Sequence, residues 1–127
     1  MFTHITIGSN DIARTKAFYD ATMAALGGAP GKIDAKERLL YVNRGGRLLI
    51  TAPLDGKPAT GANGGTIGFM AESPAEADAW HKAGIENGGG TCEDPPGIRQ
   101  GGAGPIYLAY LRDPDGNKLC ALHRMAV

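Results

Sequence analysis

The sequence predicts an α+β fold of one domain, residues 1–127, in which a unit of one strand, one helix and three strands occurs twice. Three observations support this prediction. Alternating apolar patterns, typical of strands, flank two stretches with helical periodicity. The order of these patterns restarts near residue 64, and glycine pairs stand at the same place after both helices. A chain of 127 residues can bury one hydrophobic core, but it is too short for two independent domains.

The first half, about residues 1–53, begins with an alternating, β-branched stretch at 3–7 that predicts a strand. Asp11 can cap a helix, and apolar residues spaced from Ile12 to Leu26 predict that helix over 11–26. A glycine pair at 27–28 ends it. Short strands are predicted at 31–34, 38–43 and 47–52. The composition of 53–63, rich in Gly and Pro, is typical of a linker.

The second half, about residues 64–127, repeats this order, with a strand at 66–70. Ser73, Pro74 and Glu76 form a strong helix start, with a serine N-cap, proline in the first turn and glutamate three residues after the cap. The helix is predicted over 74–87, and strands follow near 91–93, 106–112 and 117–123. The turn at 113–116, Asp-Pro-Asp-Gly, separates the last two strands.

The two halves match at a constant offset of 62 residues through the first strand and the helix. His4 then corresponds to Thr66, and Phe18 corresponds to Trp80. In the last strands the offset becomes 69 residues, so that Thr51 in the first half corresponds to Cys120 in the second. The similarity is one of pattern more than of identity, and any α+β chain shows some such match; the shared glycine pair and the aligned aromatic residue favour a duplication.

Composition excludes several classes of function. Thirteen Lys and Arg balance thirteen Asp and Glu, so no net field attracts nucleic acid or an anionic membrane. No apolar stretch approaches the roughly 18 residues of a membrane span, and the first residues do not resemble a signal peptide. A cytoplasmic location and two free thiols, Cys92 and Cys120, are therefore expected.

With these elements placed, the chain resembles the vicinal oxygen chelate superfamily, the group of glyoxalases, bleomycin resistance proteins and extradiol dioxygenases. The resemblance covers essentially the whole length. It is carried by Asn10-Asp11 with Phe18-Tyr19 after the first strand, and by the stretch 111–119, Leu-Arg-Asp-Pro-Asp-Gly-Asn-Lys-Leu. It implies two βαβββ modules that form a curved sheet, or cup, with helices on the convex face, and it implies a homodimer.

Metal-dependent members of that superfamily are similar in placing one metal ligand on the first and one on the last strand of each module. The resemblance carries these positions over to His4, Thr51, Thr66 and Cys120. Only His4 is a standard ligand there, Cys120 would serve a soft metal as thiolate, and the threonines are poor ligands. No tightly bound cofactor is therefore expected; a divalent metal held by His4 and Cys120 stays an alternative.

Strand alternation gives a second view of the cup. Ile5 and Ile7 point to one face of the first strand, which leaves His4 on the other. The cup residues are mixed in polarity, which suits a small organic ligand: His4, Thr51, Thr66, Met70 and Cys120. The glycine-rich stretch 95–104 is interpreted as a loop, either a lid that brings Arg99 to the ligand or a plain surface loop. One of the three strand tyrosines is a candidate for the pocket: Tyr41, Tyr107 or Tyr110.

Two functions remain open at this point. The first is a binding module that holds a small organic ligand in the cup between its two modules without metal. The resemblance supports it, because bleomycin-resistance-like members sequester a ligand without metal or catalysis, between two chains of a dimer. The second is an enzyme, a metal-dependent lyase, isomerase or dioxygenase that uses His4 as acid, base or metal anchor. The incomplete ligand set favours the first. Each candidate also has a plain structural reading: His4 as a hydrogen-bonded histidine, Cys120 as an inert buried thiol.

Overall fold

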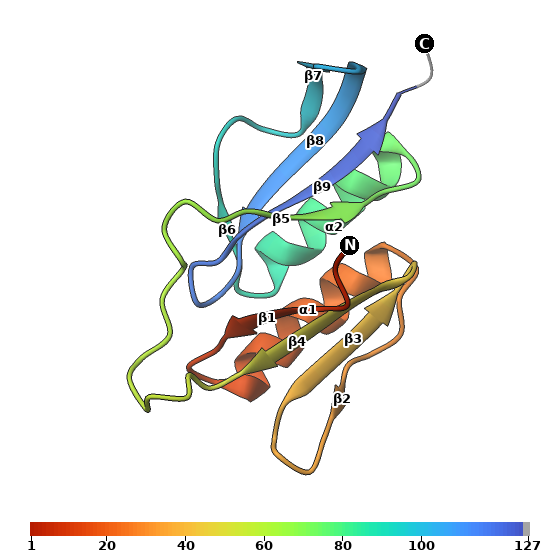
Figure 1. The fold of residues 1–127 in the computed structure, drawn as a ribbon. Helices are drawn as coiled ribbons and strands as arrows, with labels where there is room; N and C mark the ends of the chain where they lie inside the picture. Colours follow the sequence, from red (N-terminus) through yellow and green to blue (C-terminus); the bar gives the residue numbers. More distant parts are fainter. Residues whose placement is uncertain (126–127) are drawn as a thin grey trace.

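The structure of the chain is a computed structural model, and it describes residues 1–125. Within these residues two helices and nine strands follow one another along the chain (Figure 1). The elements are β1 (Ile5–Gly8), α1 (Ile12–Ala25), β2 (Lys32–Ile33), β3 (Leu39–Asn43), β4 (Gly46–Thr51), β5 (Ile67–Met70), α2 (Pro74–Glu86), β6 (Gly90–Thr91), β7 (Gly97–Gly101), β8 (Gly104–Arg112) and β9 (Lys118–Arg124).

The strands form two sheets built on the same plan. The first has the order β1-β4-β3-β2, and the second has the order β5-β9-β8-β6, with β7 also paired to β8. In each sheet the first strand runs parallel to the last, so that Ile5 lies opposite Leu48 and Ile67 lies opposite Leu119. A parallel pair needs a crossover connection, and the helices supply it. The predicted α+β fold of two βαβββ modules is confirmed.

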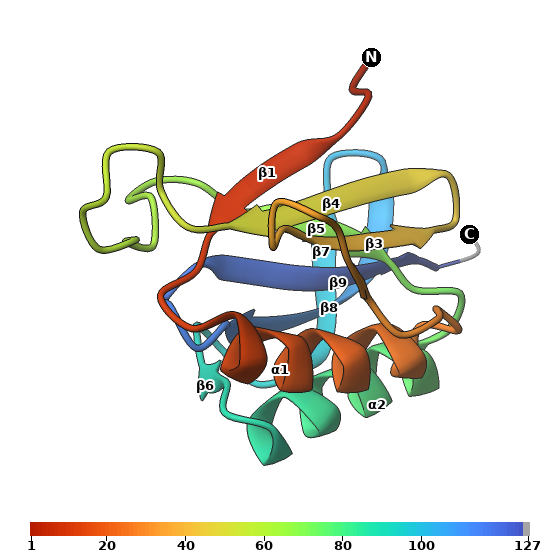
Figure 2. The same cartoon turned by 90° about the horizontal axis from the view of Figure 1, so that it is seen from below.

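Both helices begin where their capping residues stand. The Asp11 carboxylate accepts a hydrogen bond from the Arg14 amide (3.0 Å), and the Ser73 hydroxyl accepts one from the Glu76 amide (3.1 Å). These bonds satisfy backbone donors that the first turn of a helix leaves free. The two helices pack against each other on one side of the two sheets, as Figure 2 shows from below. Their predicted starts and ends agree with the structure to within about one residue.

The core lies between the helices and the inner faces of the sheets. Alternate strand residues point to the helices, and Leu39, Ile50, Leu111 and Leu119 among them are fully buried. Phe18 and Trp80, the pair that the repeat aligns, are both buried in this core from α1 and α2. The face of each sheet that is turned away from the helices is called the open face below. Its strand residues include Thr6, Arg47, Leu49 and Thr51 in the first sheet and Gly68, Met70, Tyr110 and Cys120 in the second.

The turn between β8 and β9 docks on the start of α1. The buried Asp113 carboxylate accepts hydrogen bonds from the Tyr19 hydroxyl (2.6 Å) and the Asn117 amide group (2.9 Å). Burial, together with the adjacent Asp113 carboxylate, raises the pKa of Tyr19 well above its usual value. The Asp115 carboxylate, whose side chain is fully buried, binds Arg14 (2.8 Å) and Thr15 (3.1 Å). This turn therefore ties the second module to the first.

Two predicted loops differ in the structure. The prediction of a loop over 95–104 is wrong, because 97–101 forms β7 and pairs with β8 in a hairpin. Pro95 and Pro96 only interrupt the second strand of the module, since β6 and β7 lie along the same edge of β8. The predicted linker at 53–63 has no helix or strand, but it is bonded to the first module: Asn10 exchanges hydrogen bonds with the Ala59 backbone (2.7 and 3.1 Å).

No helix in residues 1–125 is long and apolar enough to cross a membrane.

The buried bond between Tyr19 and Asp113 predicts a large effect of a small change. We expect Tyr19→Phe to lower the free energy of unfolding by about 1.5–3 kcal/mol, because it removes a donor to a buried charged acceptor. Tyr107→Phe is the matched control: its hydroxyl donates to Asp78 at the same distance, 2.6 Å, but at the surface. The control should lose less than about 1 kcal/mol. Urea denaturation of both variants measures this, and equal losses would contradict the role given to Asp113.

Candidate functional site

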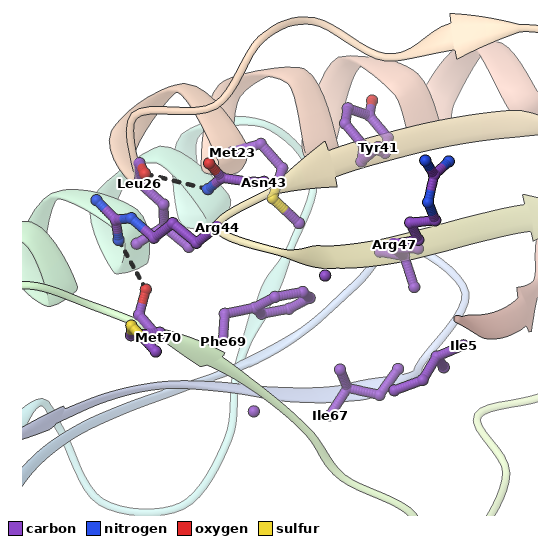
Figure 3. Close-up of a pocket in the computed structure, with 13 residues that line it drawn as sticks. Ile5, Met23, Leu26, Tyr41, Asn43, Arg44, Arg47, Ile67, Phe69 and Met70 are labelled. Carbon is purple, nitrogen blue, oxygen red and sulfur yellow. Dashed lines mark hydrogen bonds between the residues drawn. The ribbon is translucent and has the colours of Figure 1, made fainter. Parts of the chain in front are cut away.

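A cavity lies where the two sheets meet. β1 and β5 are the inner edge strands, and no backbone ladder joins them among the described residues. The cavity has a volume of about 250 Å³ and is bordered by β3, β4, β5 and the end of α1 (Figure 3). The lining residues are Ile5, Met23, Leu26, Tyr41, Asn43, Arg44, Gly46, Arg47, Leu48, Ile67, Gly68, Phe69 and Met70.

The cavity is apolar because of strand alternation. Ile5 and Leu48 lie opposite each other on the helix side of the first sheet, and Ile67 and Phe69 occupy the same side of the second. Met23 adds a flexible side chain from α1. Figure 3 shows the Met23, Ile67 and Phe69 side chains at the gap between β4 and β5. Pockets with apolar walls and few polar groups are typical of small-molecule sites.

Arg44, in the turn between β3 and β4, closes one end of the cavity. Its guanidinium donates to the Met70 carbonyl oxygen (2.8 Å) and forms a two-fold contact with the Glu76 carboxylate on α2. This hydrogen bonding raises the pKa of Arg44 and lowers the pKa of Glu76. Arg44 therefore holds the first module against the second beside the cavity, with its charge balanced.

The structure does not bring the predicted residues His4 and Thr51 together. His4 precedes β1, is exposed, and has its Nδ1 atom 2.9 Å from the Thr3 hydroxyl. Thr51, the last residue of β4, pairs with Gly8, which lies at the end of β1 farthest from His4. His4 and Gly8 are four residues apart along this extended segment, which corresponds to a distance of about 13 Å.

The other predicted residues belong to the second module. Cys120 pairs with Gly68 on one side and with Tyr110 on the other, on the open face, and Thr66 precedes β5. Burial raises the pKa of the Cys120 thiol, which keeps it protonated near neutral pH. Among the predicted pocket residues and the candidate tyrosines, Met70 and Tyr41 border the cavity.

Arg99 lies on β7, where its guanidinium donates to the Pro95 carbonyl oxygen (2.8 Å). It thereby bonds to the break between β6 and β7. Among the candidate tyrosines, Tyr110 lies on the open face, with the Lys118 ammonium over its ring at 5.1 Å. The Tyr41 and Tyr107 hydroxyls instead donate to carboxylates on the helices, Asp20 and Asp78.

Comparison with known proteins identifies the family. Residues 1–121 match the family model of the Glyoxalase/Bleomycin resistance protein/Dioxygenase superfamily. The chain belongs to this superfamily. Among curated proteins, none matches the chain.

Solved structures agree with this membership. A crystal structure of a glyoxalase/bleomycin resistance protein from Albidiferax ferrireducens T118 is 55% identical, with a TM-score of 0.93 over 98% of this chain and 99% of that one. A glyoxalase-related enzyme from Fulvimarina pelagi is 18% identical, with a TM-score of 0.73 over 98% and 88% of the two chains. Lactoylglutathione lyase from Agrobacterium tumefaciens is 20% identical, with a TM-score of 0.64 over 97% and 92%. The last two show the fold alone.

The strand registers correct one equivalence on which the metal comparison depends. Leu48 lies opposite Ile5 as Leu119 lies opposite Ile67, so the last strands match at an offset of 71. The counterpart of Cys120 is therefore Leu49 and not Thr51. The shift of two residues keeps the same face of the strand, which is why alternation could not reveal it.

The side chains present do not fit a metal centre of the superfamily. Among residues 1–125, no three His, Cys, Asp or Glu side chains are grouped closely enough to hold a metal ion. Leu49 cannot ligate, Thr66 is a poor ligand, and the Cys120 thiol is held in its protonated form. A metal ion with open positions for substrate needs about three protein ligands.

Sequence reasoning missed the residues that form the cavity wall in the turn between β3 and β4, Asn43 to Arg47. A weak signal existed, because Asn43-Arg44-Gly45-Gly46 is a turn sequence between two predicted strands. Nothing local indicates that this turn contacts β5 and α2 from the other half of the chain.

Proposed function

We propose that the protein binds a small organic molecule whose apolar part enters the cavity between β4 and β5, and that it does so without a tightly bound metal ion. The observation that carries this proposal is the lining itself: aliphatic, aromatic and thioether side chains from both modules surround a space of about 250 Å³. Ligand pockets for drug-sized molecules measure roughly 300–1,000 Å³. The ligand is therefore small, or it leaves one end outside the cavity.

The enzyme alternative, a metal-dependent lyase, isomerase or dioxygenase anchored at His4, receives no support from the donor set. Within the described chain His4 belongs to no group of three or more His, Cys, Asp or Glu side chains that could hold a metal ion. The described residues around the cavity include no His, Cys, Asp, Glu or Lys side chain, and the Tyr41 hydroxyl is engaged with the Asp20 carboxylate. General acid–base chemistry needs such a group.

The homodimer implied by the family is part of the proposal. The inner edge strands carry exposed apolar side chains: Phe2 precedes β1 with 79% of its surface exposed, and Met70 on β5 is 64% exposed. A second copy that covers them would remove this apolar surface from water and shelter the unpaired strand edges.

A dimer predicts a mass in solution twice that of one chain, measured by light scattering during gel filtration. Phe2→Glu should shift the equilibrium toward the monomer, because it would bury an unpaired charge in the interface. Leu54→Glu, at a still more exposed position in the loop between β4 and β5, is the control and should leave the mass unchanged. A wild-type protein that is monomeric at all concentrations would contradict this part of the proposal.

The cavity predicts binding of a neutral apolar probe, 1-octanol, with NMR shift changes at Met23 and Phe69. Gly46→Phe should weaken this binding about ten-fold or more, or by ~1.4 kcal/mol. Gly46 lies on the helix side of β4, and the only neighbour a Cβ atom would meet is the Asn43 carbonyl oxygen at 3.6 Å. A side chain therefore fits there without a clash, and it projects toward the cavity.

Gly102→Phe is the matched control for this experiment. A Cβ atom at Gly102 meets nothing within 4 Å, and the residue lies in the turn between β7 and β8, away from the cavity. Both variants add the same side chain, but only Gly46→Phe should affect the probe. Octanol binding that survives Gly46→Phe would show that the probe binds elsewhere and would overturn the proposed site.

The absence of a tightly bound metal is tested separately by thermal unfolding. A metal bound only to the native state raises the melting temperature. We expect the same Tm after chelator treatment, and after addition of zinc, manganese, nickel or ferrous iron. A rise in Tm with one of these ions that His4→Ala abolishes would restore the metal-dependent alternative.

A further inference from the structure

Most of the polar side chains around the cavity are already hydrogen-bonded to other groups of the protein. The Tyr41 hydroxyl donates to Asp20 (2.7 Å), and the Asn43 side-chain amide donates to the Leu26 carbonyl oxygen (3.1 Å). Arg44 is bonded to Met70 and to Glu76. Each of these groups holds the fold together and is not free to bind a ligand without breaking a bond.

Arg47 is the exception. Its side chain forms no hydrogen bond or ion pair with any other side chain in the part of the chain that the structure describes. It lies on the open face of β4, where it pairs with Val42 of β3. The next residue, Leu48, pairs with Ile5 of β1. Arg47 is among the residues that border the cavity, and Figure 3 shows its guanidinium outside the group of apolar side chains and directed away from them.

The charged side chains that line the cavity are all positive. Two arginines and no aspartate or glutamate are among the lining residues. The Arg44 charge is balanced by Glu76 and by Glu72, 3.5 Å away. Arg47 is left as an unbalanced positive charge beside an apolar wall, where a charge is screened less than in open solvent.

We propose that the ligand is an amphipathic organic anion: its apolar tail enters the cavity, and its carboxylate binds the guanidinium of Arg47 at the rim. This inference rests on the proposed function, because it assigns the polar end of the same ligand. A guanidinium presents two parallel N–H donors that match a carboxylate. Because the guanidinium lies at the rim, the carboxylate stays partly hydrated and the tail alone is buried, which avoids the cost of burying a charge.

The test compares octanoate with 1-octanol, two probes with the same tail and different heads, by NMR titration of the full chain. Arg47→Gln should weaken octanoate binding about five-fold, the effect expected for a partly exposed ion pair, and should leave octanol binding unchanged. Arg47→Lys should restore part of the octanoate affinity. Added salt should weaken octanoate binding to the wild type and not binding of the alcohol.

Lys36→Gln is the control for net charge. It removes one positive charge at an exposed position in the turn before β3, at the end of that strand far from Arg47, and should change neither affinity. If Arg47→Gln leaves octanoate binding unchanged, or weakens both probes equally, the assignment of the anion to Arg47 is overturned while octanol binding upholds the cavity. If neither probe binds the wild type, the proposed function fails, and this inference fails with it.

Discussion

The structure depends on two buried carboxylates in one turn. Asp113 and Asp115, between β8 and β9, accept hydrogen bonds both from side chains of α1 and from groups of their own turn. A buried carboxylate is costly unless it is satisfied in this way. The turn can therefore be native only when α1 is in place, and α1 is fixed against the second module by the same bonds. Asn117 extends the contact to the Gly8 carbonyl oxygen at the end of β1. Folding of each module is coupled to the other at this point.

A second clamp lies at the opposite end of the seam between the sheets. Arg44 reaches from the turn before β4 to the end of β5 and to α2. Helix α2 packs closely against both β8 and α1, since a Cβ atom on Gly84 would lie 2.3 Å from Leu111 and 3.2 Å from Phe18. The inner strands β1 and β5 are thus held near each other without a backbone ladder in the described residues. A cavity remains between them because the clamps and the helices fix the distance, and side chains alone fill the gap.

Local patterns were sufficient to predict most elements and insufficient to predict how they meet. The caps Asp11 and Ser73 and the turn at 113–116 act through neighbours in the sequence, so the sequence shows them directly. The register of the last strands is set by packing across the sheet. A shift of two residues keeps each side chain on the same face, so alternation could not distinguish Thr51 from Leu49 as the counterpart of Cys120. The strand β7 was missed because glycines and prolines mask its pattern; pairing to β8 supplies what its own propensity lacks. The cavity joins residues from both halves, and no local signal places Arg44 beside Met70.

The hydrogen bonds that hold the fold together limit what the cavity can do chemically. Its tyrosine, its asparagine and one of its arginines each bond to a group on a helix or on β5. A catalyst needs a group whose protonation or coordination can change during a reaction. A change at Tyr41 or Asn43 would break a bond between β3 and the helix side of the first module, and a change at Arg44 would break the contact between the modules. Arg47 takes part in no such bond, but a guanidinium does not give up its proton in proteins. It can attract and orient an anion and cannot transfer a proton to it. This division of roles agrees with the proposal that the protein recognises an anionic ligand.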